Sequence, residues 1–404
     1  MGFLIFLTAL VLMMHQTHIG FLRGLLENLR WLPFALLGFA VLAEMAVSGR
    51  SWRRFHGFDT YIVLWLTLAF ASAFYSIAPM LTLGRAATLL LVYVAVFWAA
   101  WRYAGRRGED RVVELLLLAG LLVLGGGLLL APLGGGLVLG VRFSGLMENP
   151  NSVGLLTALL MPLAVERLLS RRRFREYLLV GVMAVGVVLS GSRGGMLATL
   201  VGTTYVLWKA RKRVFVLGLL ASLAAMVLVL MSPREREAEM VVDPYLRAET
   251  LATGGGRVEV WPVAIRMIRQ RPLLGHGFGT EDLLFQSYGY EPESFLEHAG
   301  SYLHNSYLGL TAQVGLVGAV AFFLPLLLLA YRQLRGSLGD ERLDLSHALQ
   351  GTLLAGLITC LYESWIYSMG NSQAFPFWVC VMLLVRRKLP ARSGPSGAVK
   401  PGTP

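Results

Sequence analysis

Long apolar blocks alternate with short polar connections along most of the chain. Twelve blocks stand out, at roughly 3–22, 31–47, 60–78, 82–101, 112–131, 152–168, 176–190, 194–208, 214–231, 304–331, 348–368 and 372–386. A helix needs about 17–25 apolar residues to cross a hydrocarbon core roughly 30 Å thick. Because lipid offers no water to backbone N–H and C=O groups, a block that spans it has to be helical. The pattern therefore predicts an all-α membrane protein with about twelve transmembrane helices.

The composition supports this interpretation. Of the 404 residues, 56% are hydrophobic and only 15% are charged, whereas about a quarter of residues are charged in an average soluble domain. No basic segment precedes Phe3–Met14 and no small-residue cleavage site follows it, so we expect a first transmembrane helix there and not a signal peptide. Cys360 and Cys380 lie in late apolar blocks. We interpret them as small buried hydrophobic residues, with a disulfide between adjacent helices as the alternative.

Basic residues gather in every second connection between the blocks. The connections after the second, fourth, sixth, eighth, tenth and twelfth blocks each contain three to five Lys or Arg, and the short odd-numbered connections contain fewer. Cytoplasmic loops carry an excess of Lys and Arg, so the even connections and both termini are predicted to be cytoplasmic. The net charge of +12 then follows from topology. We therefore do not expect nucleic acid as a partner.

One odd-numbered connection is much longer than the others. It covers about 232–303, between the ninth and tenth blocks, and we expect it to face outward because long loops cross the membrane largely regardless of charge. A helix is predicted over about 258–270, because apolar side chains recur there at helical spacing. Residues 390–404 are rich in Pro, Gly and Ser and are expected to form a disordered cytoplasmic tail after a single membrane domain, 1–389.

Four polar motifs lie on the predicted outer face. They are Arg142-Phe-Ser-Gly-Leu-Met-Glu-Asn149-Pro-Asn151, Ser190-Gly-Ser-Arg193-Gly-Gly, Gly254-Gly-Gly-Arg257 with Trp261 and Arg271-Pro-Leu-Leu-Gly275-His-Gly-Phe-Gly279, and His304-Asn305-Ser306-Tyr307. Each motif alone has an ordinary explanation. An arginine at a helix end is often an interfacial anchor, Asn-Pro-Asn is a turn and helix cap, and the spaced glycines follow no strand, so they do not indicate a nucleotide loop.

Together the motifs indicate chemistry on a phosphate-bearing substrate. Arg142, Arg193 and Arg257 recur on the face that should be poor in positive charge. Arginine binds phosphate oxygens bidentately and stays charged at any working pH. A histidine such as His304 titrates near neutral pH and suits a general base. This combination is typical of group transfer from a lipid diphosphate to a hydroxyl.

In order and spacing, the four motifs, followed by Gly315-Leu-Val-Gly318, resemble those of the O-antigen ligase family. Members of this family are O-antigen ligases, O-antigen polymerases and protein O-oligosaccharyltransferases. The resemblance covers roughly 60–385, with the specific motifs confined to 142–318. It implies a bacterial inner-membrane enzyme with a periplasmic active site.

The resemblance also implies roles for particular residues. His304 would activate the acceptor hydroxyl, Arg193 and Arg257 would hold the diphosphate, and Arg142 would support them. Supporting positions are Asn149, Asn151, Asn305 and Trp261. The donor would be an undecaprenyl-diphosphate-linked glycan and the acceptor lipid A-core or another glycan. The transfer would invert the anomeric carbon and need no metal or cofactor, and no Asp-x-Asp motif lies on the predicted outer face.

The sequence leaves several functions open. A chain near 400 residues with a clear His-Asn-Ser-Tyr element favours a ligase, with a polysaccharide polymerase as the main alternative. Protein O-oligosaccharyltransferases are usually longer. A transporter would place ionisable groups inside the membrane and show repeated halves. Arg85 and Glu363 are the main ionisable residues within the blocks, and the sequence has no internal repeat.

Overall fold

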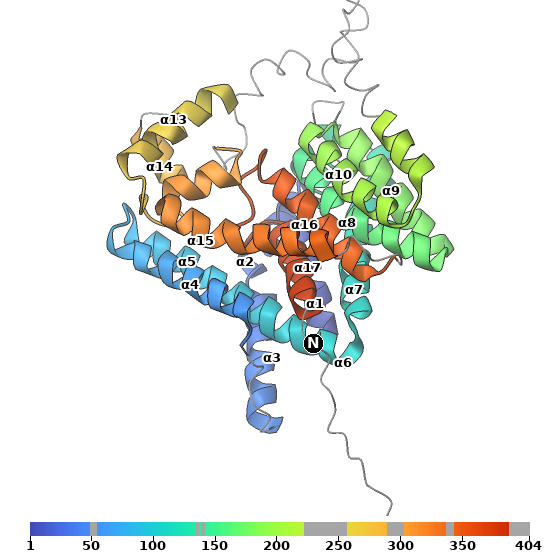
Figure 1. The fold of residues 1–404 in the computed structure, drawn as a ribbon, viewed down its shortest axis with the longest axis horizontal. Helices are drawn as coiled ribbons and strands as arrows, with labels where there is room; N and C mark the ends of the chain where they lie inside the picture. Colours follow the sequence, from blue (N-terminus) through green and yellow to red (C-terminus); the bar gives the residue numbers. More distant parts are fainter. Residues whose placement is uncertain are drawn as a thin grey trace, which may run out of the picture.

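The computed structural model describes the chain except for 49–54, 134–136, 139–141, 222–256, 289–302, 337–342 and 388–404. The described part is almost entirely helical (Figure 1). A two-stranded antiparallel ribbon, β1 (Leu137–Val138) with β2 (Arg142–Phe143), is the only sheet among these residues. The expected disordered tail and much of the 232–303 connection lie outside the described residues.

The helices follow the chain from the amino to the carboxyl end. They are α1 (Gly2–Met14), α2 (Gly20–Leu29), α3 (Leu32–Ser48), α4 (Gly57–Ala71), η1 (Ser72–Phe74), α5 (Pro79–Tyr93), the π-helical η2 (Val94–Ala100), α6 (Trp101–Arg107), α7 (Glu109–Leu130), η3 (Ala131–Leu133), α8 (Pro150–Arg171), α9 (Phe174–Ser190), α10 (Arg193–Lys209), α13 (Arg257–Gln270), α14 (Glu281–Ser287), α15 (Ser306–Gly336), α16 (Leu345–Thr359) and α17 (Ala374–Arg387). The helix expected over 258–270 is therefore present as α13.

Six helical stretches in the described residues are long and apolar enough to cross a membrane. They are Gly20–Val47, Gly57–Phe74, Pro79–Arg107, Glu109–Leu130, Pro150–Arg171 and Ser306–Gly336, and Gly2–Met14 is a shorter apolar helix. Eleven of the twelve expected blocks correspond to helices, and 213–221 is the described start of the ninth. The number of spans stays a prediction.

Two block boundaries were wrong. The block expected over 3–22 divides into α1 and α2, because the polar residues between Met14 and Gly20 interrupt the helix. The block expected over 348–368 ends as a helix at Thr359, and the chain up to Ala374 forms consecutive turns. Glu363 therefore lies in the connection between α16 and α17 and not within a helix.

Helix α8 forms the centre of the bundle. It packs against α9, α10 and α16, on the right-hand side of Figure 1. Its glycine Gly154 lies against Gly195 of α10 so closely that a Cβ on Gly195 would be 2.6 Å from the Gly154 backbone. A similar contact joins Gly202 of α10 to Gly351 of α16. Small residues allow membrane helices to approach this closely, and the approach brings the amino ends of α8 and α10 together.

Ion pairs join the even-numbered connections at one end of the bundle. Glu109 binds both Arg386 and Arg387, and Arg387 also binds Asp344. Glu114 binds Arg171 in the same region. Connections that are far apart in sequence therefore share one face, as the charge pattern predicts.

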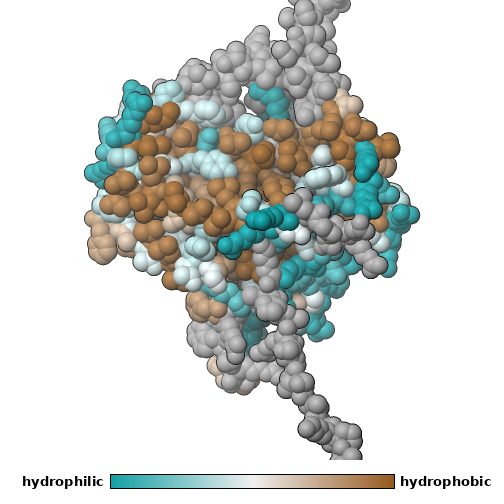
Figure 2. Space-filling model, in the orientation of Figure 1, coloured by the Kyte–Doolittle hydropathy of each residue, from teal (hydrophilic) through white to brown (hydrophobic). Residues whose placement is uncertain are grey.

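The face of the bundle that Figure 2 shows is largely apolar. Figure 2 shows hydrophobic side chains across much of the visible face, with hydrophilic ones mostly toward its margins. Cys360 and Cys380 are buried and form no disulfide, which confirms their interpretation as hydrophobic residues.

Candidate functional site

His304 immediately precedes α15 and has an unusual backbone. Its φ is +46°, in the left-handed region that few residues other than glycine adopt. Asn305 follows it as a cap, because its Oδ1 accepts hydrogen bonds from the backbone N–H groups of Tyr307 and Leu308, both at 3.0 Å. Strain of this kind persists only where the surroundings impose it, and it often marks functional positions.

Glu363 holds the imidazole of His304. The distance from His304 Nδ1 to Glu363 Oε2 is 2.7 Å, and the two side chains are 20% and 14% exposed. An ionised carboxylate accepts a hydrogen bond from Nδ1–H, so the lone pair of the neutral imidazole is then on Nε2. The pair therefore directs the basic nitrogen of His304 away from Glu363.

A chain of hydrogen bonds continues from Glu363 to the motif at 142–151. Asn151 Nδ2 donates to Glu363 Oε1 at 3.3 Å, and Arg142 Nη2 donates to Asn151 Oδ1 at 3.0 Å. Arg142 Nε donates to the backbone oxygen of Ser190 at 3.0 Å. The Arg142 side chain is buried in the wall of the site. Residues from four distant segments thus form one network around His304.

The two asparagine positions of the Asn-Pro-Asn motif have different roles. Asn149 caps α8, because its Oδ1 accepts from the backbone N–H of Asn151 at 2.8 Å. Asn151 instead uses its side chain in the network. The structural interpretation of the motif therefore holds for Asn149 only.

Arg193 lies close to this network as the first residue of α10. Ser192 caps the helix, with its Oγ accepting from the Gly195 N–H at 3.3 Å. The side chain of Tyr362, next to Glu363 in sequence, lies 3.3 Å from where a Cβ on Gly194 would be. Arg193 thus combines its own charge with the positive end of a helix dipole, an arrangement that binds anions.

The third motif contributes through α13. Trp261 Nε1 donates to the backbone oxygen of Leu303 at 3.1 Å, directly before His304. Val263, Ala264 and Met267 are buried on the face of α13 that packs against α15. Arg257 is the first residue of α13, but its side chain lies outside the described residues.

The glycine-rich run Gly275–Gly279 packs against a break in helix α15. Its three glycines have positive φ, from +69° to +114°. The N–H groups of His276 and Gly277 donate to the backbone oxygen of Gln313, at 2.9 and 2.8 Å. Gly315 interrupts α15 there with φ +67° and ψ −176°. The N–H of Leu316, which follows the break, donates to Pro272 O at 2.8 Å, so the run fills the interruption in α15.

Two titratable groups near the site have shifted pKa values because they are buried. Desolvation lowers the pKa of His276, whose Nδ1 contacts the backbone oxygen of Ala312. Desolvation raises the pKa of Glu281, which accepts hydrogen bonds from Tyr367 and Gln313. Both groups are enclosed by the protein, and we interpret them as parts of the scaffold around His304.

Sequence reasoning missed Glu363 and Glu281 as members of the site. Glu363 had one signal, because a carboxylate near the end of an apolar block is costly unless it has a partner. Its pairing with His304 depends on where α16 ends, which hydropathy alone does not give. Within the described residues, His, Cys, Asp and Glu side chains form no group of three suited to a metal ion. Metal independence stays a prediction.

The comparison with protein families agrees with this geometry. A family model described as O-antigen ligase matches residues 178–323. This part of the chain is similar to the O-antigen ligase family. The matched part contains Arg193, Arg257, Trp261 and His304, and Glu363 lies beyond its carboxyl end. No curated protein matches the chain.

The family match confirms the resemblance expected from the motifs. It indicates a glycosyltransferase-like membrane enzyme of ligase or polymerase type that uses lipid-linked glycans. Of the two ionisable residues that a transporter interpretation could place within helices, Glu363 lies in a connection between α16 and α17, whereas Arg85 lies within α5.

Proposed function

We propose that the protein transfers a glycan from undecaprenyl diphosphate to a sugar hydroxyl of lipid A-core. It would act at the periplasmic face of a bacterial inner membrane, with both termini in the cytoplasm. The observation that carries the proposal is the network from His304 through Glu363 and Asn151 to Arg142, beside the amino end of α10. An oriented base next to a cationic helix terminus suits transfer from a diphosphate to a hydroxyl.

In the proposed reaction the acceptor oxygen attacks the anomeric carbon of the donor glycan. His304 Nε2 takes the hydroxyl proton while the new C–O bond forms. The bond between the anomeric carbon and the phosphate oxygen breaks, and undecaprenyl diphosphate leaves with the electron pair. Attack opposite the leaving group inverts the anomeric configuration. The charge on the leaving diphosphate is met by arginine, so the reaction requires no metal ion.

Arg193 and Arg257 are the proposed diphosphate ligands. Arg193 lies in the first turn of α10, where its guanidinium and the helix dipole act on the same anion. For Arg142, diphosphate binding was expected, but its bonds to Asn151 and Ser190 favour a positioning role. Arg142 would hold Asn151, and Asn151 would hold Glu363.

An apolar groove beside α10 suits the polyprenyl chain of the donor. It has a volume of about 720 Å³ and lies between α8, α9, α10 and residues 214–219. Met196 and Leu197, one turn from Arg193, form part of its wall. A diphosphate held at Arg193 would therefore have its hydrocarbon chain directed into this groove.

The test is a transfer assay with the purified full-length protein in lipid nanodiscs. With an undecaprenyl-diphosphate-linked glycan and lipid A-core, the wild type should produce glycan-bearing lipid A-core. His304→Gln should reduce the rate by roughly 10²-fold or more. Elongated lipid-linked glycan without modified core would identify a polymerase instead. Transfer to neither acceptor, or full activity of the His304→Gln variant, would contradict the proposal.

A further inference from the structure

A polar cavity of about 340 Å³ lies next to the His304–Glu363 pair. Its walls come from the ends of α1 and α3, from α5, from the start of α14 and from the connection between α16 and α17. Ser364, in the wall, follows Glu363 and accepts a hydrogen bond from the Asn305 N–H. Glu281, also in the wall, accepts from the Leu303 N–H. Two residues of the cavity wall therefore contact the backbone on either side of His304.

The charges in this cavity do not suit a diphosphate. Two arginines, Arg30 and Arg85, share it with two carboxylates, Glu281 and Asp282. Arg85 is paired with Asp282 at 3.2 Å and also donates to the backbone oxygen of Gly279. At most one positive charge, on Arg30, is thus in excess. A hydroxyl-rich group of little charge matches such a wall better than a diphosphate does.

Arg30 and Trp31 give the cavity the features of a sugar site. The Arg30 guanidinium lies 5.5 Å from the centre of the Trp31 ring. Arg30 Nε is buried and has no hydrogen-bond partner in the described part of the chain. Gln16 adds a side-chain amide to the wall. An aromatic face packs on the C–H face of a pyranose, while guanidinium and amide groups bind its hydroxyls.

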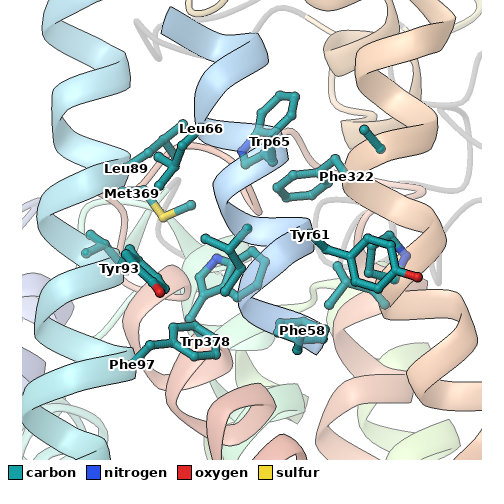
Figure 3. Close-up of a pocket in the computed structure, with 15 residues that line it drawn as sticks. Phe58, Tyr61, Trp65, Leu66, Leu89, Tyr93, Phe97, Phe322, Met369 and Trp378 are labelled. Atoms are coloured by element: carbon teal, nitrogen blue, oxygen red, sulfur yellow. The ribbon is translucent and has the colours of Figure 1, made fainter. Parts of the chain in front are cut away.

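An aromatic slot between α4, α5, α15 and α17 lies beside the cavity (Figure 3). Met369 belongs to both, and Figure 3 shows its side chain between Tyr93, Leu89 and the rings of the slot. Trp65 of the slot packs edge-on against Phe278 of the cavity, at 5.6 Å between ring centres. Tyr61 lies at the exposed edge of the slot. A ligand here would meet polar groups at one end and hydrocarbon at the other.

We propose that the cavity binds the acceptor, as the terminal sugar of a lipid-borne glycan whose hydrocarbon part lies along the aromatic slot. The donor then occupies the opposite side of His304, at Arg193 and the groove between α8, α9 and α10. The two lipid substrates approach one histidine from separate sides of the bundle. This inference rests on the proposed function, because it assigns the second substrate of the same reaction.

The test introduces a larger side chain into the cavity and measures the KM of the acceptor and of the donor separately. A Cβ on Gly370 would lie 3.4 Å from the Trp31 ring, so Gly370→Leu projects into the sugar site. Arg30→Gln removes the unpartnered donor without adding volume. Gly181→Leu, in α9, adds the same atoms into open space and is the matched control. Each variant is purified as the full-length protein, checked for a monodisperse profile, and assayed with lipid A-core as acceptor.

Gly370→Leu and Arg30→Gln should each raise KM for lipid A-core about tenfold and leave KM for the lipid-linked donor within twofold. Native mass spectrometry of lipid A-core on the wild type and on Gly370→Leu gives a second readout. If lipid A-core binds the wild type but not Gly370→Leu, the acceptor site is supported, whether or not the wild type transfers glycan. Absence of transfer by the wild type would refute only the proposed function. Unchanged acceptor KM and binding in both variants, or a matching rise in donor KM, would overturn the acceptor assignment.

Discussion

In the proposed reaction, Glu363 would determine how His304 acts as a base. The carboxylate fixes Nδ1 and the left-handed backbone fixes the position of the ring, so Nε2 points in one direction. A histidine on a flexible loop would have to lose rotamer freedom at each turnover. The geometry therefore assigns Glu363 as a positioning residue that acts through His304.

At the residue scale, replacement of Glu363 by Gln should lower kcat on the order of 10²-fold, because the amide does not stabilise the imidazolium formed on proton transfer. Donor binding should stay within twofold. The pH profile of the rate should also differ from that of the wild type, because the imidazole loses its carboxylate partner. Activity is measured against pH for wild type, Glu363→Gln and Glu363→Asp. If kcat and the pH profile of Glu363→Gln match the wild type, Glu363 has only a structural role.

At the scale of elements, α15 depends on a second segment for its continuity. Gly315 breaks the helix, and the backbone of Leu273 occupies the space where its side chain would be. A Cβ on Gly315 would lie 2.1 Å from the backbone oxygen of Leu273. The segment Arg271–Gly279 and α15 therefore fold as one unit, and this unit holds the start of α15 against α13.

Gly315→Ala should destabilise the protein, because its backbone conformation alone costs an alanine about 1–3 kcal/mol. The contact with Leu273 adds to that cost. Thermal denaturation in detergent, followed by loss of the monodisperse peak, measures the effect. Gly84→Ala in α5 is the matched control, since a Cβ there meets nothing within 4 Å. A melting temperature for Gly315→Ala equal to that of the control would show that the break in α15 tolerates a side chain.

The sequence predicted element types well and the pairing of side chains poorly. Apolar periodicity located α8, α10 and α13, because burial and helix geometry leave a direct trace in hydropathy. The motifs around Asn151 and His304 were recognised from residue types. The hydrogen bond between His304 and Glu363 was not predicted. It joins residues 59 positions apart and depends on α16 ending at Thr359. Likewise, the sequence of Gly275–Gly279 does not indicate that this run packs against the break in α15.

At the scale of the whole molecule, the ion pairs and the network around His304 lie toward opposite ends of α8, at Arg171 and at Asn151. Glu109, Arg171 and Arg387 mark one face, and His304 and Asn151 mark the other. Positive-inside topology then places the ion-paired face in the cytoplasm. The face with His304 would be periplasmic, where glycan acceptors are available.

Labelling of single cysteines tests this orientation. Gln286→Cys, at an exposed position of α14, should react with a membrane-impermeant maleimide in intact spheroplasts. Arg173→Cys, between α8 and α9, should react only after permeabilisation. The two native cysteines are at most 1% exposed and should contribute little background. The reverse labelling pattern would invert the topology, and with it the side on which transfer occurs.

The π-helical stretch η2 changes the direction in which side chains point along the long helix from Pro79 to Arg107. A π-helical turn contains more residues than an α-helical turn, so each side chain beyond it is rotated relative to the α-helical phase. Leu89 lines the aromatic slot before the stretch, while Arg102 and Arg106 reach Glu44 after it. The stretch is equivalent to a one-residue insertion. The side chains before it and after it therefore face different neighbours along one continuous helix. Two chains of the same hydropathy that differed by one residue there would direct these arginines toward different neighbours.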